Sequence, residues 1–475
     1  MSGGPFPFGF SGGSGGSGEG SGGGPGGSSD PFGFGGGNIF AELQRLMSWQ
    51  GGPVNWDMAR QVAEQSIGTD DPPVTDAEKT SVIEAGRLAD HWLDEVTVLP
   101  GVGGELASWN RMQWIRETLP VWQTLADPIA GKVVDAMGSA LAGGLSDLPQ
   151  NPELASQLPP GFDLSQLTTA GGPFLGILKQ IGGLLFGAQV GSALAALAQE
   201  VVSPTDVGLP LGGAALVPRN VAATGDGLEV PDDQVRLYLA LRELAHQRLF
   251  AHVPWLRSQL LGAVEAYARG ITVDPEAISR AVSSIDPSVL DPSKLDPESL
   301  AEALGDDVFR TENSPAQDAA LGRLETMLAL IEGWVDEVVD AAARDRLPSA
   351  SALRETVRRR RASGGPAEQT FAALVGLELR PRRLREAATL WRALLDVRGP
   401  DGRDAVWSHP DLMPSSSDLD DPDAFARVST DADLDPIAEL QRLADSPGDT
   451  APPEGGTQPS GEGDDDSGEG PDKQV

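Results

Sequence analysis

The sequence predicts a mainly α-helical protein, with a multi-helix body between a Gly-rich head and an acidic tail. Helical periodicity dominates the middle of the chain, and no run of alternating apolar and polar residues predicts an extended sheet. Both ends have compositions that cannot supply a core. We therefore place the body at residues 38–414, which is long enough to bury a substantial core.

The two ends are predicted from composition. Residues 1–37 are almost entirely Gly, Ser, Pro and Phe, so they bury too little apolar surface to offset their ordering entropy. Residues 415–475 are rich in Asp, Glu, Pro and Gly and close on GDDDSGEGPDKQV. We expect a disordered head and a disordered acidic tail.

Helix starts in the body carry the expected signals. Thr75 is followed by Glu78 in the spacing of a capping box, and Ser314-Pro315 supplies a cap and a first-turn proline. A short β element is expected within 207–216 or 228–230. The predicted helices are Ile39–Trp49, Trp56–Ser66, Thr75–Val96, Gly104–Leu119, Asp127–Leu145, Phe174–Val202, Pro231–Ala251, Pro254–Ala268, Pro315–Arg346, Ser349–Arg361, Gln369–Val375, Pro381–Val397 and Arg403–Ser408.

Charge and cysteine content exclude several classes of function. A net charge of −35 argues against a general nucleic-acid binder, which needs clustered Lys and Arg. Two basic runs depart from this pattern, and we interpret them as solvated faces or as partners of the chain's own acidic groups rather than as an RNA or anion site. They are residues 358–361 and Arg380, Arg382, Arg383 and Arg385. With no cysteine, disulfides and thiolate metal sites are excluded.

The chain opens without a basic n-region or an apolar h-region, so we expect it to stay in the cytoplasm. Residues 181–198 carry no charge, and small residues recur there every four positions at Gly183, Gly187, Gly191 and Ala195. Half of the segment is Ala or Gly and charges flank it closely. We predict a buried helix packed closely on a neighbour, without stable membrane insertion.

The helix predicted at Pro231–Ala251 is the one that carries chemistry. It is apolar on two opposite sides, as in a buried helix. A polar sector is set into it, made of Arg242, Glu243, His246 and Gln247. Because buried polar groups need partners, this sector is either a satisfied network or a site.

Glu243 and His246 form the latter part of His-Glu-x-x-His, in which two His bind zinc and the Glu polarises the attacking water. Arg242 stands where the first His would be, and a guanidinium has no lone pair to offer a metal. His252 lies six residues after His246, but on an unbroken helix the two would point about 120° apart.

A second acidic helix could complete a site. Glu325, Glu332 and Asp336 share one face of the predicted helix Pro315–Arg346. A carboxylate from such a later helix is a suitable third zinc ligand. The alternative interpretation is a solvated acidic face.

The run from Arg242 to Arg257 resembles the actinobacterial zinc-dependent metalloprotease (zincin-like) family, whose members are labelled hydrolases. So do the segments 187–191, 203–211, 332–336 and 407–412. The resemblance implies a zincin-like body, a zinc ion, Glu243 as catalytic base, and His246 and Glu332 as metal ligands. His252 and Asp336 are weaker candidate ligands.

Two hypotheses follow from Arg242. The first is a zinc-dependent metallohydrolase, peptidase-like, with a degenerate Glu-x-x-His motif. The second is a catalytically inactive zincin-like scaffold that binds a peptide or protein partner. In the second, Arg242 structurally replaces a metal ligand and pairs with Glu332 or Asp336.

Overall fold

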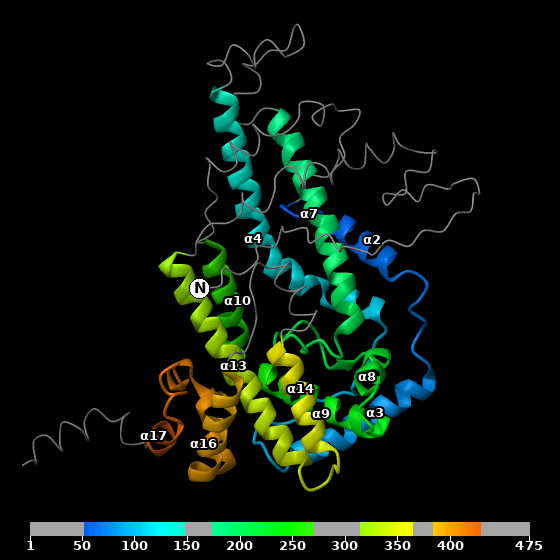
Figure 1. Ribbon diagram of the computed structural model, residues 1–475, viewed down its shortest axis with the longest axis vertical. Coiled ribbons are helices and arrows are strands. Elements are labelled where there is room, and N and C mark those ends of the chain that lie inside the picture. Colours follow the sequence, from blue (N-terminus) through cyan, green and yellow to red (C-terminus); the bar gives the residue numbers. More distant parts are fainter. Residues whose placement is uncertain (1–51, 148–172, 270–313, 364–382, 429–475) are drawn as a thin grey trace, which may run out of the picture. The chain divides into compact units, whose positions relative to one another are not determined.

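The computed structural model describes residues 52–147, 173–269, 314–363 and 383–428 (Figure 1). Within them the predicted mainly α fold is confirmed. The helices are α2 Trp56–Ile67, α3 Asp76–Leu93, α4 Arg111–Asp147, α7 Pro173–Glu200, α8 Pro218–Gly225, α9 Asp232–His252, α10 Pro254–Arg269, α13 Pro315–Ala343, α14 Ala350–Ser363, α16 Leu384–Asp404 and α17 Pro422–Arg427, with 3-10 turns η3 Ala405–Ser408 and η4 Pro410–Leu412. The predicted helices Ile39–Trp49 and Gln369–Val375, and the head at 1–37, lie outside the described residues.

The predicted helix starts are confirmed by their hydrogen bonds. The Thr75 amide donates to Glu78 Oε2 at 2.8 Å, and the Glu78 amide donates to Thr75 Oγ1 at 3.3 Å. Ser314 caps α13 in the same reciprocal way, with Gln317 as its partner. These caps satisfy amide groups that the first turn of a helix leaves without partners.

The segment before α4 differs from the prediction. Helices were expected at Gly104–Leu119 and Asp127–Leu145, but one helix runs continuously through Pro120 and Pro128. An interior proline costs roughly 3 kcal/mol, and burial of side chains such as Trp122 offsets this cost by keeping the helix against the core.

A two-residue strand precedes α4. β1, Ala107–Ser108, pairs in parallel with β2, Ala215–Leu216. The predicted β element within 207–216 is therefore confirmed, while 228–230 forms no strand.

Helix α7 packs on α2 and α4, and Figure 1 shows α4 and α7 side by side. A Cβ atom added to Gly187 or Gly191 would collide with the backbone of Asn55 or Ala59 in α2 and its cap. The small residues thus allow close approach of two helices, which confirms that part of the prediction. Residues Gly182–Glu200 are also long and apolar enough to cross a membrane by length and composition, although about half of that stretch is buried in the fold.

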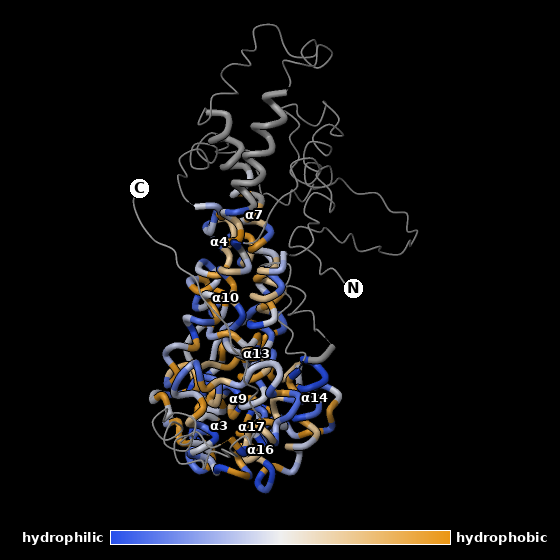
Figure 2. The backbone as a smooth tube through the Cα atoms, turned by 90° about the vertical axis from the view of Figure 1, so that its left-hand side faces the viewer, coloured by the Kyte–Doolittle hydropathy of each residue, from blue (hydrophilic) through white to orange (hydrophobic). Residues whose placement is uncertain are grey.

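Helix α9 contacts α3, α8, α10 and α13, so other elements cover most of its surface. Figure 2 shows hydrophobic and hydrophilic residues interspersed along the helices, and the buried apolar side chains of α9 belong to the hydrophobic core. This placement explains why thirteen residues of α9 are buried.

The body extends beyond Ser415, where we placed the start of the tail. Helix α17, Pro422–Arg427, packs on α16. Arg398 of α16 donates hydrogen bonds to the carbonyls of Phe425 and Ala426, and its guanidinium lies over the Phe425 ring, 5.9 Å from the ring centroid. These contacts fix a segment whose acidic composition alone indicated a tail.

Candidate functional site

The polar sector of α9 is buried. Arg242 is 7%, Glu243 1% and His246 2% exposed. Groups this deeply buried lose their hydrogen bonds to water, so each needs a partner within the fold. All three have such partners, supplied by α13, by the loop that follows α7 and by α9 itself.

The central contact joins α9 to α13. Arg242 Nη2 lies 2.7 Å from Glu332 Oε2, and Glu332 is 1% exposed. The other carboxylate oxygen, Oε1, accepts from Arg361 Nη2 of α14 at 2.7 Å and lies 3.2 Å from His246 Nε2. Both oxygens of Glu332 are therefore engaged by basic side chains.

His246 is held from both ring nitrogens. Its Nδ1 lies 2.9 Å from the backbone carbonyl of Arg242, and because a carbonyl only accepts, Nδ1 donates. The imidazole also stacks on Phe250, with ring centroids 6.3 Å apart. Nε2 is consequently directed at Glu332.

Glu243 lines the same pocket as Arg242 and His246, and its side chain is held by the loop after α7. Thr205 Oγ1 donates to its Oε2, and Gln247 Nε2 donates to its Oε1 at 2.8 Å. Gln247 also donates to the carbonyl of Gly212 at 3.0 Å. Burial raises the pKa of Glu243, and hydrogen bonds from Ser203, Thr205 and Gln247 offset this only in part.

Burial also opposes ionisation of Glu332, but here the charged neighbours prevail. Arg361, His246 and Arg242 together hold the pKa of Glu332 well below its usual range. For Arg242, burial works to lower the pKa and the Glu332 carboxylate outweighs it, so the pKa is raised. Both pKa shifts favour the charged form of the group, which indicates an ion pair that persists across the ordinary pH range.

The loop after α7 is shaped to reach this site. Asp206 Oδ2 accepts from the Val202 amide at 3.0 Å, and the Gly208 amide donates to the Thr205 carbonyl at 2.8 Å. Gly208 has a φ of +81°, a conformation that side chains disfavour, and lies close to Glu332. The glycine lets the loop turn tightly beside α13 and present Thr205 to Glu243.

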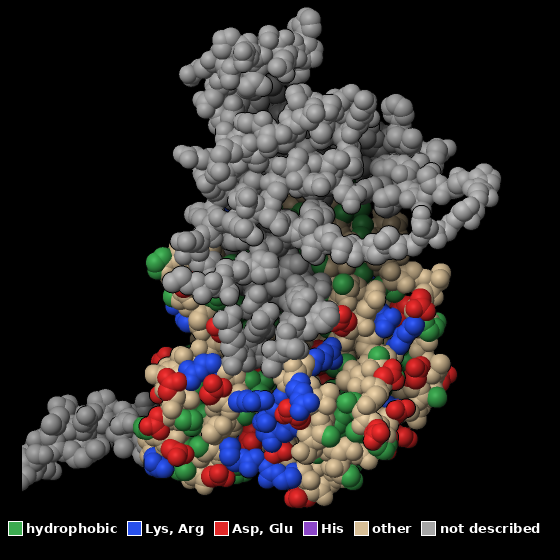
Figure 3. Space-filling view, viewed as in Figure 1, with side chains coloured by type: hydrophobic (Ala, Val, Ile, Leu, Met, Phe, Trp, Pro, Cys, Tyr) green, Lys and Arg blue, Asp and Glu red, His purple; other side chains and the backbone are tan. Residues whose placement is uncertain are grey.

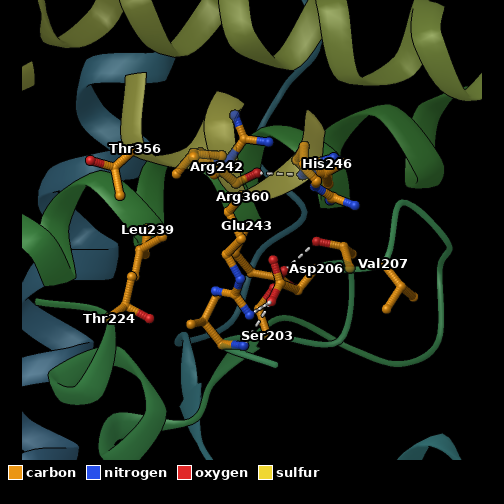
Figure 4. Close-up of a pocket in the computed structure, with 14 residues that line it drawn as sticks. Ser203, Asp206, Val207, Thr224, Leu239, Arg242, Glu243, His246, Thr356 and Arg360 are labelled. Carbon is orange, nitrogen blue, oxygen red and sulfur yellow. Dashed lines mark hydrogen bonds and ion pairs between the residues drawn. The ribbon is translucent and has the colours of Figure 1, made fainter. Parts of the chain in front are cut away.

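A small pocket opens beside these residues, with about 40 Å³ of space for the centres of water molecules. In Figure 4, Glu243 lies between Arg242 and the loop carrying Ser203 and Asp206, while Leu239, Thr224 and Thr356 form the other side. Space of this size admits ordered water or a small group of a larger ligand.

The structure brings together Arg242, Glu243, His246 and Glu332, but not the two weaker candidates. His252 lies exposed at the last position of α9. Asp336 is buried but is bound by Arg354 and Arg358 of α14 rather than by Arg242. Of the two partners predicted for Arg242, Glu332 is therefore the one found.

These residues do not fit a zinc ion. Arg242 occupies a ligand position with a group that has no lone pair, and it also takes one oxygen of Glu332. Only His246 and Glu332 remain as ligands there, and they contact each other. Among the described residues, no group of three or more His, Cys, Asp or Glu is arranged to hold a metal. Structural and catalytic zinc sites take at least three protein ligands.

Two contributors to the site were not predicted from the sequence. Arg361 belongs to the basic run 358–361, which we interpreted only as a charged face or an acid partner. Thr205 belongs to the segment 203–211, which was singled out by resemblance without a role. That segment was the available signal for Thr205; nothing in the spacing placed Arg361 at Glu332.

Two comparisons find similarity between this chain and known proteins. A family profile described as zincin-like metallopeptidase matches residues 54–426. A solved structure from Chloroflexus aurantiacus, described as a candidate hydrolase with a novel fold, is similar at 19% identity and a TM-score of 0.51, covering 78% of this chain and 97% of the other. That likeness concerns the fold. The comparison with curated proteins finds no match.

Proposed function

Because the chain belongs to the zincin-like metallopeptidase family, we propose that it is a member in which an arginine has replaced the metal, and that it binds a peptide or protein partner without cleaving it. The observation that carries this proposal is the 2.7 Å contact between Arg242 Nη2 and Glu332 Oε2. It places a fixed positive charge on the carboxylate that family resemblance assigns to zinc.

The ion pair can join the helices in the way that a bound metal ion would. It links α9 to α13, and Arg361 links α14 to the same carboxylate. Guanidinium–carboxylate hydrogen bonds are charge-assisted and directional. A helix pair that a zinc ion would otherwise join is thus joined by side chains of the chain itself.

The alternative function is a zinc-dependent metallohydrolase with Glu243 as base. What favours it is the position of Glu243 at the pocket wall, where burial raises its pKa towards the range useful for proton transfer. What disfavours it is the donor set, because the general base of such an enzyme acts on a metal-held water. Two ligands and an arginine do not hold that metal.

Elemental analysis of the untagged full-length protein separates the two functions. We expect no stoichiometric zinc in the wild type or in His246→Ala after purification without chelators and equilibration with micromolar zinc. About one zinc per chain in the wild type, lost in His246→Ala, would overturn the proposal. Peptidase activity in the wild type that is lost in Glu243→Gln would overturn it independently.

A further inference from the structure

A row of ion pairs joins helices α13 and α14. Acidic side chains four residues apart form a stripe on α13, and arginines spaced four and three residues apart form a stripe on α14. The pairs run in opposite directions along the two helices: Arg361–Glu332 at 2.7 Å, Arg358–Asp336 at 2.5 Å, Arg354–Asp336 at 2.6 Å and Arg354–Asp340 at 2.8 Å. Figure 3 shows Lys and Arg side chains gathered where Figure 1 draws α14, with acidic side chains among them.

The other arginines of this helix are also paired. Arg359 binds Glu355, and Arg360 binds Asp206 and the Glu200 carbonyl. This confirms the interpretation that the basic run at 358–361 pairs with acidic groups of the chain.

Apolar packing of α14 is concentrated at its start. Among its described side chains, the buried apolar ones are Ala350 and Leu353, both in the first turn, and Val357 adds a partly buried contact with the core. The other contacts of the second half are mainly those of the arginines. The Arg354 and Arg358 side chains keep 17% and 24% of their surface exposed. Salt screens the pairs of the partly exposed Arg354 and Arg358 more than the buried Arg361–Glu332 pair, whose side chains are 7% and 1% exposed, and it does not weaken apolar packing.

The second half of α14 is also a wall of the pocket. Thr356, Val357, Arg360 and Arg361 line it, facing the residues of α9. Release of this half would open the pocket. It would also separate Asp336 from Arg358 and one oxygen of Glu332 from Arg361.

We propose that the acidic stripe Glu332–Asp336–Asp340 is a docking surface for an arginine-bearing helix, and that α14 occupies it as a releasable strap when no partner is bound. This inference rests on the proposed function and names its partner class. Asp336 and Glu332 are 2% and 1% exposed, and an unpaired carboxylate at such a depth is strongly unfavourable. Whatever displaces α14 must therefore bring cations at the same helical spacing.

Hydrogen exchange of the full wild-type chain tests the strap. We expect amides of residues 354–361 to exchange at least about tenfold faster than those of 328–339 in α13. Local opening of α14 is enough to expose the former, whereas the latter need a larger unfolding. Exchange in α14 should quicken further when salt rises from ~0.1 M to ~1 M, as the screening length falls from about 10 Å to about 3 Å. Exchange in α14 that is as slow as in α13 at both salt concentrations would overturn the proposal.

A peptide copy of residues 350–363 tests the docking surface. We expect the labelled peptide to bind Arg354→Gln/Arg358→Gln at least about tenfold more tightly than it binds the wild type, where α14 competes at a high effective concentration. A control peptide with Gln at 354, 358 and 361 should bind neither. Equal binding of both peptides, or no binding of the arginine peptide, would refute the docking surface.

Leu353→Ala provides a second loosened variant should the double variant fail to fold. It removes an apolar anchor of α14 and leaves every carboxylate paired, so it should also bind the arginine peptide more tightly than the wild type does. Failure of the peptide to bind this folded variant would count against the inference. Zinc content is independent of these measurements, so failure of the strap is distinguishable from failure of the proposed function.

Discussion

Arg242 and Glu332 lie ninety positions apart in the sequence and form a buried ion pair with Nη2 and Oε2 2.7 Å apart. The pair stands at the position where family resemblance implies a zinc ion. Its consequences for stability, metal content and pH dependence can each be measured.

Arg242→Ala should destabilise the fold by about 3–5 kcal/mol, because it leaves the Glu332 carboxylate buried with less compensation. Arg236→Ala on the same helix is the matched control, since Arg236 forms no ion pair with the residues that the structure describes. It should change stability by no more than about 0.5 kcal/mol. Chemical denaturation measures both variants. An Arg242→Ala midpoint that matches the control would contradict a stabilising pair.

Arg242→His combined with Arg361→Gln should create a zinc site. The double change supplies a third ligand beside His246 and Glu332 and removes both guanidinium groups from the carboxylate. We expect about one zinc per chain by elemental analysis, and none when His246→Ala is added. A double variant that folds and binds no zinc would show that more than the arginines keeps the metal out.

Stability should fall as the pH drops below 4.5, the ordinary pKa of Glu332. The pKa of Glu332 is lower in the folded than in the unfolded protein. Its contribution to the free energy of unfolding is therefore fully present above the unfolded pKa and is lost as the pH falls towards the folded pKa. The slope is at most about 1.4 kcal/mol per pH unit for one proton. Glu332→Gln should flatten this slope in denaturation measured from pH 6 to pH 3.

Glu243→Gln serves as a control in which stability is expected to change with pH in the opposite direction. Burial raises the pKa of Glu243, so its contribution is present below the unfolded pKa and is lost as pH rises through the folded one. The variant should therefore gain stability relative to wild type as pH increases above 4.5. Identical pH profiles for the two Gln variants would contradict the assigned directions.

Tyr238→Phe should be neutral or stabilising by up to about 1 kcal/mol, because the Tyr238 hydroxyl is buried and has no hydrogen-bond partner among the described residues. Burial raises the pKa of Tyr238 to about 12. The wild type should accordingly lose about 2–3 kcal/mol as the pH rises from 10 to 12, and the variant should not. Denaturation at alkaline pH measures this difference.

Gly191→Ala should destabilise the fold by roughly 1–3 kcal/mol through overpacking. Its new Cβ would collide with the Ala59 carbonyl of α2. Gly182→Ala in the same helix meets nothing within 4 Å, so it should be neutral or stabilising by up to about 1 kcal/mol. Thermal denaturation of the two variants compares them directly, and equal midpoints would argue against close packing of α2 and α7.

Helices with strong local signals were predicted to within a few residues. Thr75 and Ser314 cap their helices as the spacing indicated, and α9 begins one residue after the predicted Pro231. Prediction was wrong where tertiary contacts outweigh local preference. The Pro120 and Pro128 positions do not interrupt α4, because packing of the flanking side chains outweighs the lost hydrogen bonds.

The residues of the candidate site likewise fall into those that local sequence patterns predicted and those that only tertiary contacts could reveal. Helical spacing alone placed Arg242, Glu243 and His246 in one buried sector, because residues three and four apart share a face. It could not choose between Glu332 and Asp336 as the partner of Arg242, since both lie on one face of α13. Arg361 could not be assigned at all, because its contact depends on how α14 folds back on α13.

The sequence by itself determined that this protein is helical, that α9 is buried and that its polar residues need partners, because periodicity and residue chemistry are local properties. Only the tertiary structure decided which partners they have. Arg361 and Asp336 illustrate this: the turn after α13 lays α14 antiparallel beside it, and that arrangement gives Glu332 a second arginine and withdraws Asp336 from Arg242. An ion pair depends on distance in space, which the sequence specifies only through the whole fold.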